Sequence, residues 1–339
     1  MKFNKKTLVT GATGFIGSHL VKLLAENGVP VVATDIKPSA EIPSSVTFVQ
    51  ADIRDQNSVE PLLQNVDRIF HVAGICNFTT PHQKLAEVNI HGVDLITKLS
   101  IKHKIRSYVH LSSSSVYGLY QGNPFSEDSD CKPAESYGRS KLAGEAIVKS
   151  RIQEGLQAVI LRPCTVYGPG CNDGAGKVFS RPSDIAGIPG SGRQKLANVR
   201  VEDVASAAEF LSQKENAIGQ IFNVADDSQP ELAQALNLAA SVFQSNIKQI
   251  HVPLAVLKVL AQAQGIIAKL QKKIPDLEYE AIKYLYSDYI VNNAKLKSFG
   301  YELLYPEFSK SMQQMAQQNK KTSKQNTKTG NHNETDNRN

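Results

Sequence analysis

The sequence has few cysteines and no long hydrophobic run. Its 339 residues include four scattered cysteines, no two of which have the C-x-x-C spacing. This number is too small for a disulfide framework, so we expect reduced thiols and a cytoplasmic protein. The absence of about 20 consecutive apolar residues predicts that no helix spans a membrane. The N-terminal apolar run is broken by glycines and lacks the pattern of a signal peptide.

Positive charge is in excess, but half of the excess lies at the end of the chain. The whole sequence has 38 Lys and Arg against 32 Asp and Glu. Residues 319–339 alone hold five cations and two anions, without a large apolar side chain. The rest is nearly balanced, so binding to nucleic acid is not predicted. We expect 319–339 to be a disordered basic tail that adds weak attraction to a membrane surface, so the cytoplasmic protein could be peripheral to a membrane.

Short apolar runs alternate with helical patterns through residues 1–170. The predicted strands are residues 7–9, 31–34, 46–49, 68–73, 108–112 and 157–163, and the predicted helices are 15–26, 56–63, 85–104 and 137–153. Continuous apolar strands separated by helices are typical of a parallel sheet covered on both faces. Right-handed crossovers then predict an α/β fold, a doubly wound parallel sheet of the Rossmann type.

After Gly168 the pattern becomes irregular and rich in glycine and proline. We expect residues 171–318 to form mainly a smaller C-terminal α/β substrate domain, with return segments near 201–251 completing the first domain. The predicted helices are 201–212, 231–244, 252–270, 279–286 and 308–318, and the predicted strands are 220–224 and 247–251. Helix 252–270 is the most apolar. It is either a core helix, or the wall of an apolar substrate pocket or a membrane-surface contact.

A glycine-rich loop follows the first predicted strand. Gly11, Gly14 and Gly17 have G-x-x-G-x-x-G spacing between that strand and the first helix. Such glycines allow a tight turn, a close approach of N–H groups to a pyrophosphate, and close packing of helix on strand. Asp35 ends the second strand, 18 residues after Gly17. A carboxylate there binds ribose hydroxyls and repels a 2′-phosphate, so we expect NAD as the cofactor rather than NADP.

A second pattern places a tyrosine and a lysine on one helix face. Tyr137 and Lys141 are separated by four positions, which is about one helical turn. The ordinary pKa of tyrosine is about 10, and a nearby ammonium group and a positively charged nicotinamide would both lower it. A serine run, residues 112–115, leaves a predicted strand at the carboxyl edge of the sheet, where a hydroxyl could bind a substrate oxygen.

These motifs together resemble the extended short-chain dehydrogenase/reductase superfamily of NAD-dependent epimerases and dehydratases. The matching segments, within residues 5–310, are TGATGFIGSHL, Asp35, Asp52-Ile53, HVAG, Asn89, SSSSVYG, YGRSK, LRPCTVYGPG and VEDV. The resemblance implies that Tyr137 is the catalytic acid and base, that Lys141 lowers its pKa and binds the nicotinamide ribose, and that Ser113 rather than Ser114 is the catalytic serine. It also implies a homodimer that pairs through helices 85–104 and 137–153.

The resemblance further implies which residues surround the cofactor. Asp52 and Ile53 are expected to flank adenine, Ala73 to line the cofactor channel, and Pro163 and Val166 to lie near the nicotinamide. The full expected set is Gly11, Thr13, Gly14, Phe15, Ile16, Gly17, Asp35, Asp52, Ile53, Ala73, Asn89, Tyr137, Lys141, Pro163 and Val166. No metal site is expected, because the histidines lack ligand spacing.

The reaction is less strongly indicated. Ser114 and Ser115 stand where sugar-nucleotide dehydratases carry Asp-Glu, Thr165 where epimerases usually have Asn, and Arg200 where His or Tyr is common. The segment LRPCTVYGPG is more similar to the 3β-hydroxysteroid dehydrogenase and dihydroflavonol reductase branch. We therefore expect an NAD-dependent oxidoreductase for a secondary alcohol or ketone of a hydrophobic, steroid- or lipid-like small molecule. A nucleotide-sugar epimerase is the alternative, and a non-catalytic NAD(H)-binding sensor is a third hypothesis.

Overall fold

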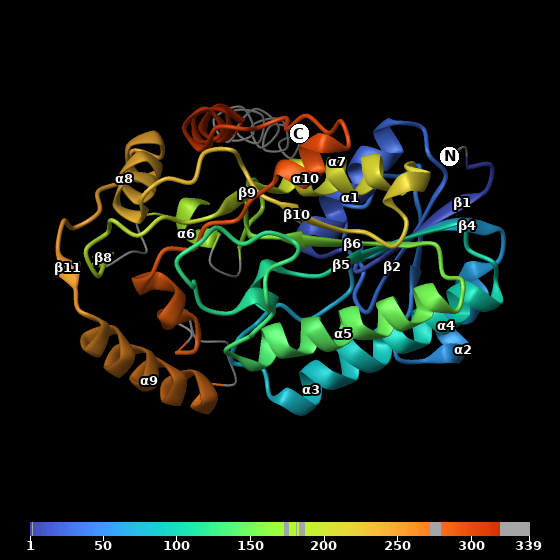
Figure 1. Cartoon of the computed structure of the whole chain (residues 1–339), viewed down its shortest axis with the longest axis horizontal. Coiled ribbons are helices and arrows are strands. Elements are labelled where there is room, and N and C mark those ends of the chain that lie inside the picture. Colours follow the sequence, from blue (N-terminus) through green and yellow to red (C-terminus); the bar gives the residue numbers. More distant parts are fainter. Residues whose placement is uncertain (2, 173–175, 181, 183–186, 272–278, 319–339) are drawn as a thin grey trace, which may run out of the picture.

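The computed structural model describes residues 1, 3–172, 176–180, 182, 187–271 and 279–318. The predicted tail, 319–339, lies outside the described residues. A parallel sheet with helices on both faces occupies one side of the molecule, and a smaller helical part occupies the other (Figure 1).

The sheet confirms the predicted doubly wound α/β fold. Seven parallel strands have the order β10-β6-β5-β4-β1-β2-β3. They are β1 (Lys6–Thr10), β2 (Val31–Asp35), β3 (Thr47–Gln50), β4 (Val66–His71), β5 (Ser107–Leu111), β6 (Ala158–Pro163) and β10 (Ile221–Val224). The direction of winding reverses between β1 and β4, and ligands of such folds bind outside the carboxyl ends of the strands at this point.

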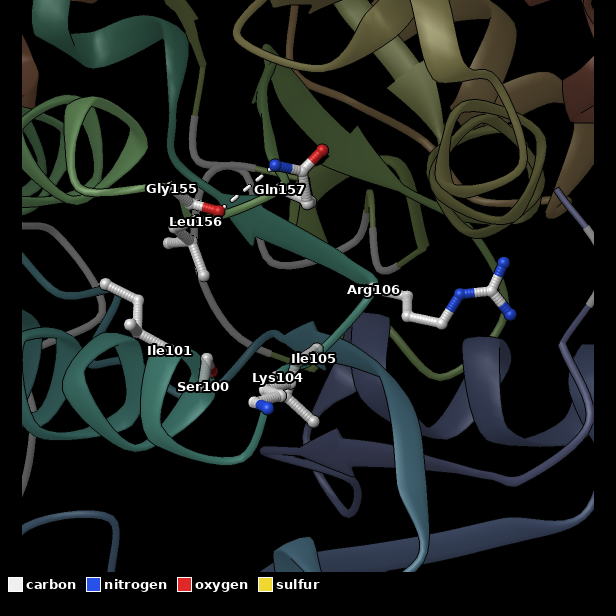
Figure 2. Close-up of a pocket in the computed structure, with 8 residues that line it drawn as sticks. All are labelled: Ser100, Ile101, Lys104, Ile105, Arg106, Gly155, Leu156 and Gln157. Carbon is white, nitrogen blue, oxygen red and sulfur yellow. Dashed lines mark hydrogen bonds between the residues drawn. The ribbon is translucent and has the colours of Figure 1, made fainter.

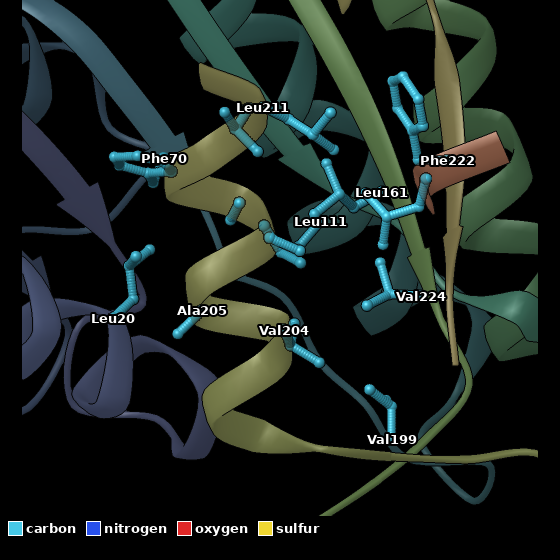
Figure 3. Packing of buried hydrophobic residues seen from close by; sticks show 14 of the residues in the cluster. Leu20, Phe70, Leu111, Leu161, Val199, Val204, Ala205, Leu211, Phe222 and Val224 are labelled. Carbon is cyan, nitrogen blue, oxygen red and sulfur yellow. The ribbon is translucent and has the colours of Figure 1, made fainter. Parts of the chain in front are cut away.

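Helices α1 (Phe15–Glu26) and α7 (Val201–Ser212) cover one face, and α4 (Val93–Lys102) and α5 (Ser136–Gln153) cover the other (Figure 1). On the first face, α7 lies over the sheet with its apolar side chains directed at the strands (Figure 3). Leu111, Leu161 and Phe222 of three neighbouring strands belong to the same buried cluster as Val204 of α7. This packing makes α7 and β10 part of the doubly wound sheet and its helices, although residues 164–200 separate α7 from β6.

The predicted long helix 85–104 is not uniform. It consists of α3 (His82–Ala86), a π-helical turn (Glu87–Gly92) and α4. A π turn inserts one extra residue per turn and is frequent at functional sites. The predicted helix 56–63 is likewise divided, into α2 (Gln56–Val59) and a 3₁₀ turn (Glu60–Leu63).

The smaller part is built from short elements around a separate apolar cluster. Its elements are β7 (Thr165–Tyr167), α6 (Lys177–Ser180), β8 (Ile188–Pro189), β9 (Asn198–Arg200), α8 (Leu232–Val242), β11 (His251–Val252), α9 (Leu254–Leu270), a 3₁₀ helix (Ala281–Tyr286) and helical residues 308–318. Tyr167, Phe179 and Phe308 meet at its centre, with ring centroids 5.0–5.9 Å apart. Of the segments near 201–251 expected to complete the first domain, only α7 and β10 pack with the large sheet. Helix α8 belongs to the separate cluster, and β11 pairs with β8.

Two predictions for this part need correction. The predicted strand 247–251 is reduced to β11, and α9 is not a core helix, since Val259, Ile266 and Leu270 are 64%, 65% and 80% exposed. An unpredicted helix, α10 (Ala294–Ser298), follows the 3₁₀ helix and lies near β10 in Figure 1.

A buried ion pair joins α5 to the sheet. Arg162 and Glu145 are 1% and 0% exposed, and the guanidinium donates to both carboxylate oxygens, at 2.8 and 2.6 Å. Ser112 Oγ donates to the same carboxylate at 2.6 Å. Arg162 also donates to the hydroxyl of Tyr117, which donates to Asn223 of β10. The network therefore ties α5 to β5, β6 and β10.

Replacing Arg162 by Met should lower the free energy of unfolding by about 3–5 kcal/mol, because the buried Glu145 carboxylate keeps as its counter-charge only the half-exposed Lys149, 3.7 Å away. Urea denaturation followed by circular dichroism measures the change. The double variant Glu145→Leu/Arg162→Met should lose less than the sum of the single losses. Lys310→Met, which breaks the exposed pair with Glu307, is the control and should cost less than about 1 kcal/mol. Additive losses for Glu145 and Arg162 would show that the pair is not coupled.

Candidate active site

The glycine loop adopts a conformation that only glycine accommodates. Gly11 has φ +68°, and a Cβ there would lie 2.6 Å from Cα of Ala73. A Cβ at Gly17 would lie 1.9 Å from the carbonyl oxygen of Gly11, so the helix packs closely on the loop. Gly14 is the N-cap of α1, whose first turn carries no acidic side chain. The positive end of α1 therefore faces a cradle without side chains, which fits the diphosphate of a dinucleotide.

Asp35 lies beside this loop, at the end of β2. Its Oδ2 accepts a hydrogen bond from the Thr13 N–H at 3.1 Å, and its Oδ1 accepts one from the Ile36 N–H at 2.7 Å. The carboxylate is thus held at the edge of the cradle, the position from which it would meet a ribose. Phe15 and Ile16 are half-buried in the first turn of α1.

The three predicted catalytic residues come together at the carboxyl ends of the strands. Ser113 follows β5, and Tyr137 and Lys141 lie in the first two turns of α5. Ser113 Oγ is hydrogen bonded to Ser115 Oγ at 2.7 Å, and the Ser113 side chain also acts on the Tyr137 hydroxyl, whose pKa it lowers. Lys141 Nζ donates to the carbonyl of Leu111, two residues before Ser113. Ser113 thus joins Tyr137 and Lys141, which follow it by 24 and 28 positions, in one polar cluster at the carboxyl edge of the sheet.

Burial dominates the protonation of this cluster. Tyr137 and Lys141 are each 7% exposed. Burial raises the pKa of the Tyr137 hydroxyl well above its ordinary value, and Cys76 raises it further. Burial also lowers the pKa of Lys141 to about 8. In the protein without cofactor, desolvation of the phenolate therefore outweighs the ammonium group of Lys141, which is directed to the Leu111 carbonyl, and the lowering of the Tyr137 pKa by Lys141 and bound nicotinamide together stays a prediction.

Asn89 holds the cluster from the π turn. Its Oδ1 accepts from the Ile75 N–H at 2.8 Å, and its Nδ2 donates to the Ile75 carbonyl at 3.0 Å and to Ser140 Oγ at 2.9 Å. Ser140 in turn donates to the Tyr137 carbonyl at 2.7 Å. Asn89 therefore fixes the chain after β4 against α5.

The other predicted cofactor residues have different surroundings. Ala73 contacts Gly11 closely, and Pro163 and Val166 follow one another at the end of β6 and in β7. Asp52 is paired with Arg54, and Ile53 is 6% exposed and packs against Gly92. The Ile53 side chain is therefore part of the core. Only the backbone of Ile53 or the Asp52 side chain could contact adenine. Their roles toward the cofactor remain predictions.

The structure adds site residues that the sequence analysis did not identify. Cys76 lies near the Tyr137 hydroxyl and raises its pKa. The Phe78 ring lies 5.6 Å from that of Tyr137 and 6.0 Å from that of Tyr284. Glu135 accepts from the Gly138 N–H and from the Tyr284 hydroxyl, so it caps α5 and anchors Tyr284. Only the HVAG motif immediately before Cys76 could have pointed to this loop.

The described part of the chain contains no group of three or more His, Cys, Asp or Glu residues placed to hold a metal ion. An open pocket at the opposite edge of the sheet is not part of the candidate site. Its lining comes from the end of α4, the start of β5 and the turn before β6, whereas the catalytic residues follow the carboxyl ends of strands (Figure 2).

Two neutral histidines lie beneath the catalytic residues. His71 and His110 are paired across β4 and β5, with ring centroids 5.8 Å apart. The Ala73 N–H donates to Thr10 Oγ1, which is 2.9 Å from His71 Nδ1. Burial lowers the pKa of His71 from 6.5 to about 3, and it lowers the pKa of His110 well below 6.5. Lys141 adds to both effects.

These histidines should make the protein sensitive to acid. Unfolding lets them bind protons below pH 6.5, so the stability that their neutral forms provide is full above pH 6.5 and is lost as the pH falls toward 3. His110→Leu should make the fall in unfolding free energy shallower, by up to about 1.4 kcal/mol per pH unit. Urea denaturation between about pH 7 and about pH 5 measures it. The exposed His82→Leu should leave the slope unchanged, and an equal slope in His110→Leu would contradict the assignment.

Comparison with known proteins gives relatives for most of the chain. An uncharacterized protein of Sinorhizobium fredii, y4nG, is 35% identical over 206 residues, which are 60% of this chain and 52% of the relative. The UDP-N-acetyl-alpha-D-glucosaminuronate decarboxylase of Bacillus cytotoxicus is 30% identical over 272 residues, which are 74% of this chain and 84% of the relative.

Among solved structures, the UDP-glucose 4-epimerase of Thermotoga maritima has the same fold. The TM-score is 0.76 at 22% identity, over 94% of this chain and 99% of the epimerase. Residues 7–225, which run from β1 past β10, match the NAD dependent epimerase/dehydratase family. Because this region contains the glycine loop, Asp35 and the Ser113–Tyr137–Lys141 cluster, sequence and geometry agree, and the chain belongs to the NAD dependent epimerase/dehydratase family.

Proposed function

We propose that this family member binds NAD at the glycine loop and oxidises and reduces a secondary hydroxyl group of a nucleoside-diphosphate sugar. The observation that carries the proposal is the convergence of Ser113, Tyr137 and Lys141 beside the loop and Asp35. The cradle at Gly11 and Gly17 has no room for side chains and suits the cofactor diphosphate.

Tyr137 moves the proton in this reaction. Bound NAD supplies the hydride chemistry, by accepting a hydride from the carbinol carbon or returning it to the ketone. The protonated Tyr137 hydroxyl, favoured by burial, donates to a ketone oxygen during reduction. In the oxidation direction the phenolate form of Tyr137 must take up the alcohol proton, and the Lys141 ammonium would stabilise the negative charge of that phenolate. Ser113, whose side chain acts on the Tyr137 hydroxyl, would hold the substrate oxygen in line with it.

The relatives favour a sugar nucleotide over the steroid- or lipid-like substrate expected from the sequence. The decarboxylase and the epimerase described above are both named for UDP-sugars. The unusual Arg200 does not oppose this assignment. Its guanidinium is buried and donates to Glu202, Ser311 and Gln318, so Arg200 anchors the helical residues 308–318 rather than selecting a substrate.

A hydrophobic alcohol remains the second candidate because of the aromatic side chains around the hydroxyl. Phe78 contacts both Tyr137 and Tyr284, and Tyr284 also lies 5.8 Å from Tyr289. These rings form an apolar wall beside the catalytic cluster. Aromatic faces also pack on sugar rings, so the wall suits both substrate classes.

A substrate screen tests the proposed function. The protein is incubated with NAD and UDP-, GDP- or dTDP-sugars, and products are separated by anion-exchange chromatography and identified by NMR. Epimerised sugar nucleotide is the expected result. NADH formation with steroid alcohols, and none of the sugar products, would support the second candidate instead. NADH binding without turnover of any alcohol, ketone or sugar nucleotide would support the non-catalytic sensor.

Tyr137→Phe should reduce kcat by about 100- to 10,000-fold, because it removes the group that exchanges the proton. NADH binding, measured by the fluorescence of the bound nicotinamide, should be retained. Tyr120→Phe removes a hydroxyl outside the catalytic cluster and should leave kcat within about twofold. Full activity in Tyr137→Phe would disprove the assigned role.

Asp35→Asn should weaken NADH binding by roughly 10- to 100-fold, since it removes a charged acceptor for ribose hydroxyls. The preference for NADH over NADPH should shrink, because the repulsion of a 2′-phosphate is lost. Fluorescence titration with the two cofactors measures both effects. Glu41→Gln, an exposed acid near the end of β2, serves as the control. Tighter binding of NADPH than NADH by the unsubstituted protein would refute the role of Asp35.

A further inference from the structure

Helix α9 presents a continuous apolar stripe to solvent. The stripe consists of Val256, Val259, Leu260, Ala263, Ile266, Ile267 and Leu270, whose spacing of three and four residues places them on one side of the helix. The six larger side chains are 47–80% exposed. Single exposed aliphatic residues are common on proteins, but a row of six on one helix is not.

The helix is oriented opposite to the usual arrangement. Its most buried residues are small: Ala261 and Ala268 are only 2% and 7% exposed, while Leu254 and Leu257 are half-buried. The six large aliphatic groups of the stripe point away from the protein. In Figure 1, α9 lies at the margin of the smaller part, far from the seven-stranded sheet.

Lysines outnumber acidic residues in the segment that contains α9. Residues 232–275 contain no Asp or Glu, but they contain Lys248, Lys258, Lys269, Lys272 and Lys273, whereas Asp276, Glu278 and Glu280 follow. The segment therefore combines an aliphatic stripe with an excess of cations. Lys258 lies within α9, where it is half-buried three positions before Ala261.

We propose that the α9 stripe docks on a lipid bilayer with anionic headgroups and holds the protein at the membrane surface. Exposed aliphatic side chains enter the boundary between headgroups and acyl chains, while the lysines meet the lipid anions. The helix has 17 residues, and the described residues include no helix that is long and apolar enough to cross a bilayer, so α9 would lie in the plane of the surface.

The charges argue against a second copy of the chain as the occupant. Pairing two α9 stripes would bring together two segments that each carry five lysines and no acid, and like charges at an interface disfavour association. A polyanion such as a nucleic acid would match the charge but would leave the aliphatic stripe in water. An anionic bilayer satisfies both features. The inference does not depend on the proposed function, because it concerns a surface outside the catalytic cluster.

The lack of tryptophan in the chain permits a direct test. In the full-length variant Val259→Trp, the only indole of the protein lies on the stripe. Its emission should shift to the blue with vesicles of phosphatidylcholine and phosphatidylserine, and brominated lipids should quench it. Leu304→Trp places the indole at an exposed site elsewhere and should show neither change. An unchanged Val259→Trp spectrum, or equal changes at both positions, would overturn the proposal.

Vesicle sedimentation tests the contribution of the stripe and the charge. Ile266→Glu/Ile267→Glu should weaken binding to the anionic vesicles by roughly 100-fold, because each aliphatic group left in water costs about a factor of ten. Leu304→Glu, a matched exposed site, should bind like the unsubstituted chain, and salt or pure phosphatidylcholine should weaken binding. Circular dichroism and NADH binding show that the variants are folded.

Three results would contradict the proposal. Equal binding to neutral and anionic vesicles would remove the role of the lysines. Binding that survives the double Glu substitution but is lost on deletion of 319–339 would assign it to the tail. Self-association that the double substitution abolishes, without any vesicle binding, would show that α9 pairs with a second copy.

Discussion

The Glu145–Arg162 ion pair is the constraint on which the arrangement of the candidate site depends. Two opposite charges that have almost no contact with water must stay paired, so α5 has one stable position against β5 and β6. Tyr137 and Lys141 lie two turns and one turn before Glu145 on that helix. Ser112, next to the catalytic serine, donates to the same carboxylate. The pair therefore sets the relative positions of all three catalytic groups.

The burial that requires this pairing also sets the protonation of the site. Desolvation favours the neutral forms of four side chains. Two are His71 and His110 on neighbouring strands, and the other two are Tyr137 and Lys141 on α5. A protonated phenol can donate a proton directly. It can accept one only after it has lost its own, and nearby positive charge favours that loss. The site thus depends on a balance between a dry environment and nearby cations rather than on either alone.

The two parts of the molecule differ in how they bury their large apolar side chains. In the doubly wound part, α7 buries its apolar side chains against the strands, and the irregular chain before it does not disturb this packing (Figure 3). In the smaller part, α9 buries two alanines and exposes six large aliphatic side chains. Departures of this kind from the usual burial pattern are expected where a surface serves a function.

The sequence alone determined the succession of strands and helices in residues 1–170, the glycine loop, Asp35 and the position of Tyr137 and Lys141 one turn apart on one helix. Each depends on short-range spacing, since one helical turn or one strand end places the residues. Only the tertiary structure decided that Cys76, Phe78 and Tyr284 surround Tyr137, that Asn89 sits in a π turn, and that Arg162 pairs with Glu145. It also decided which side of α9 is covered. Periodicity shows that a helix has an apolar face, but segments distant in the chain decide what covers that face. Distant segments also decide whether water reaches a polar group.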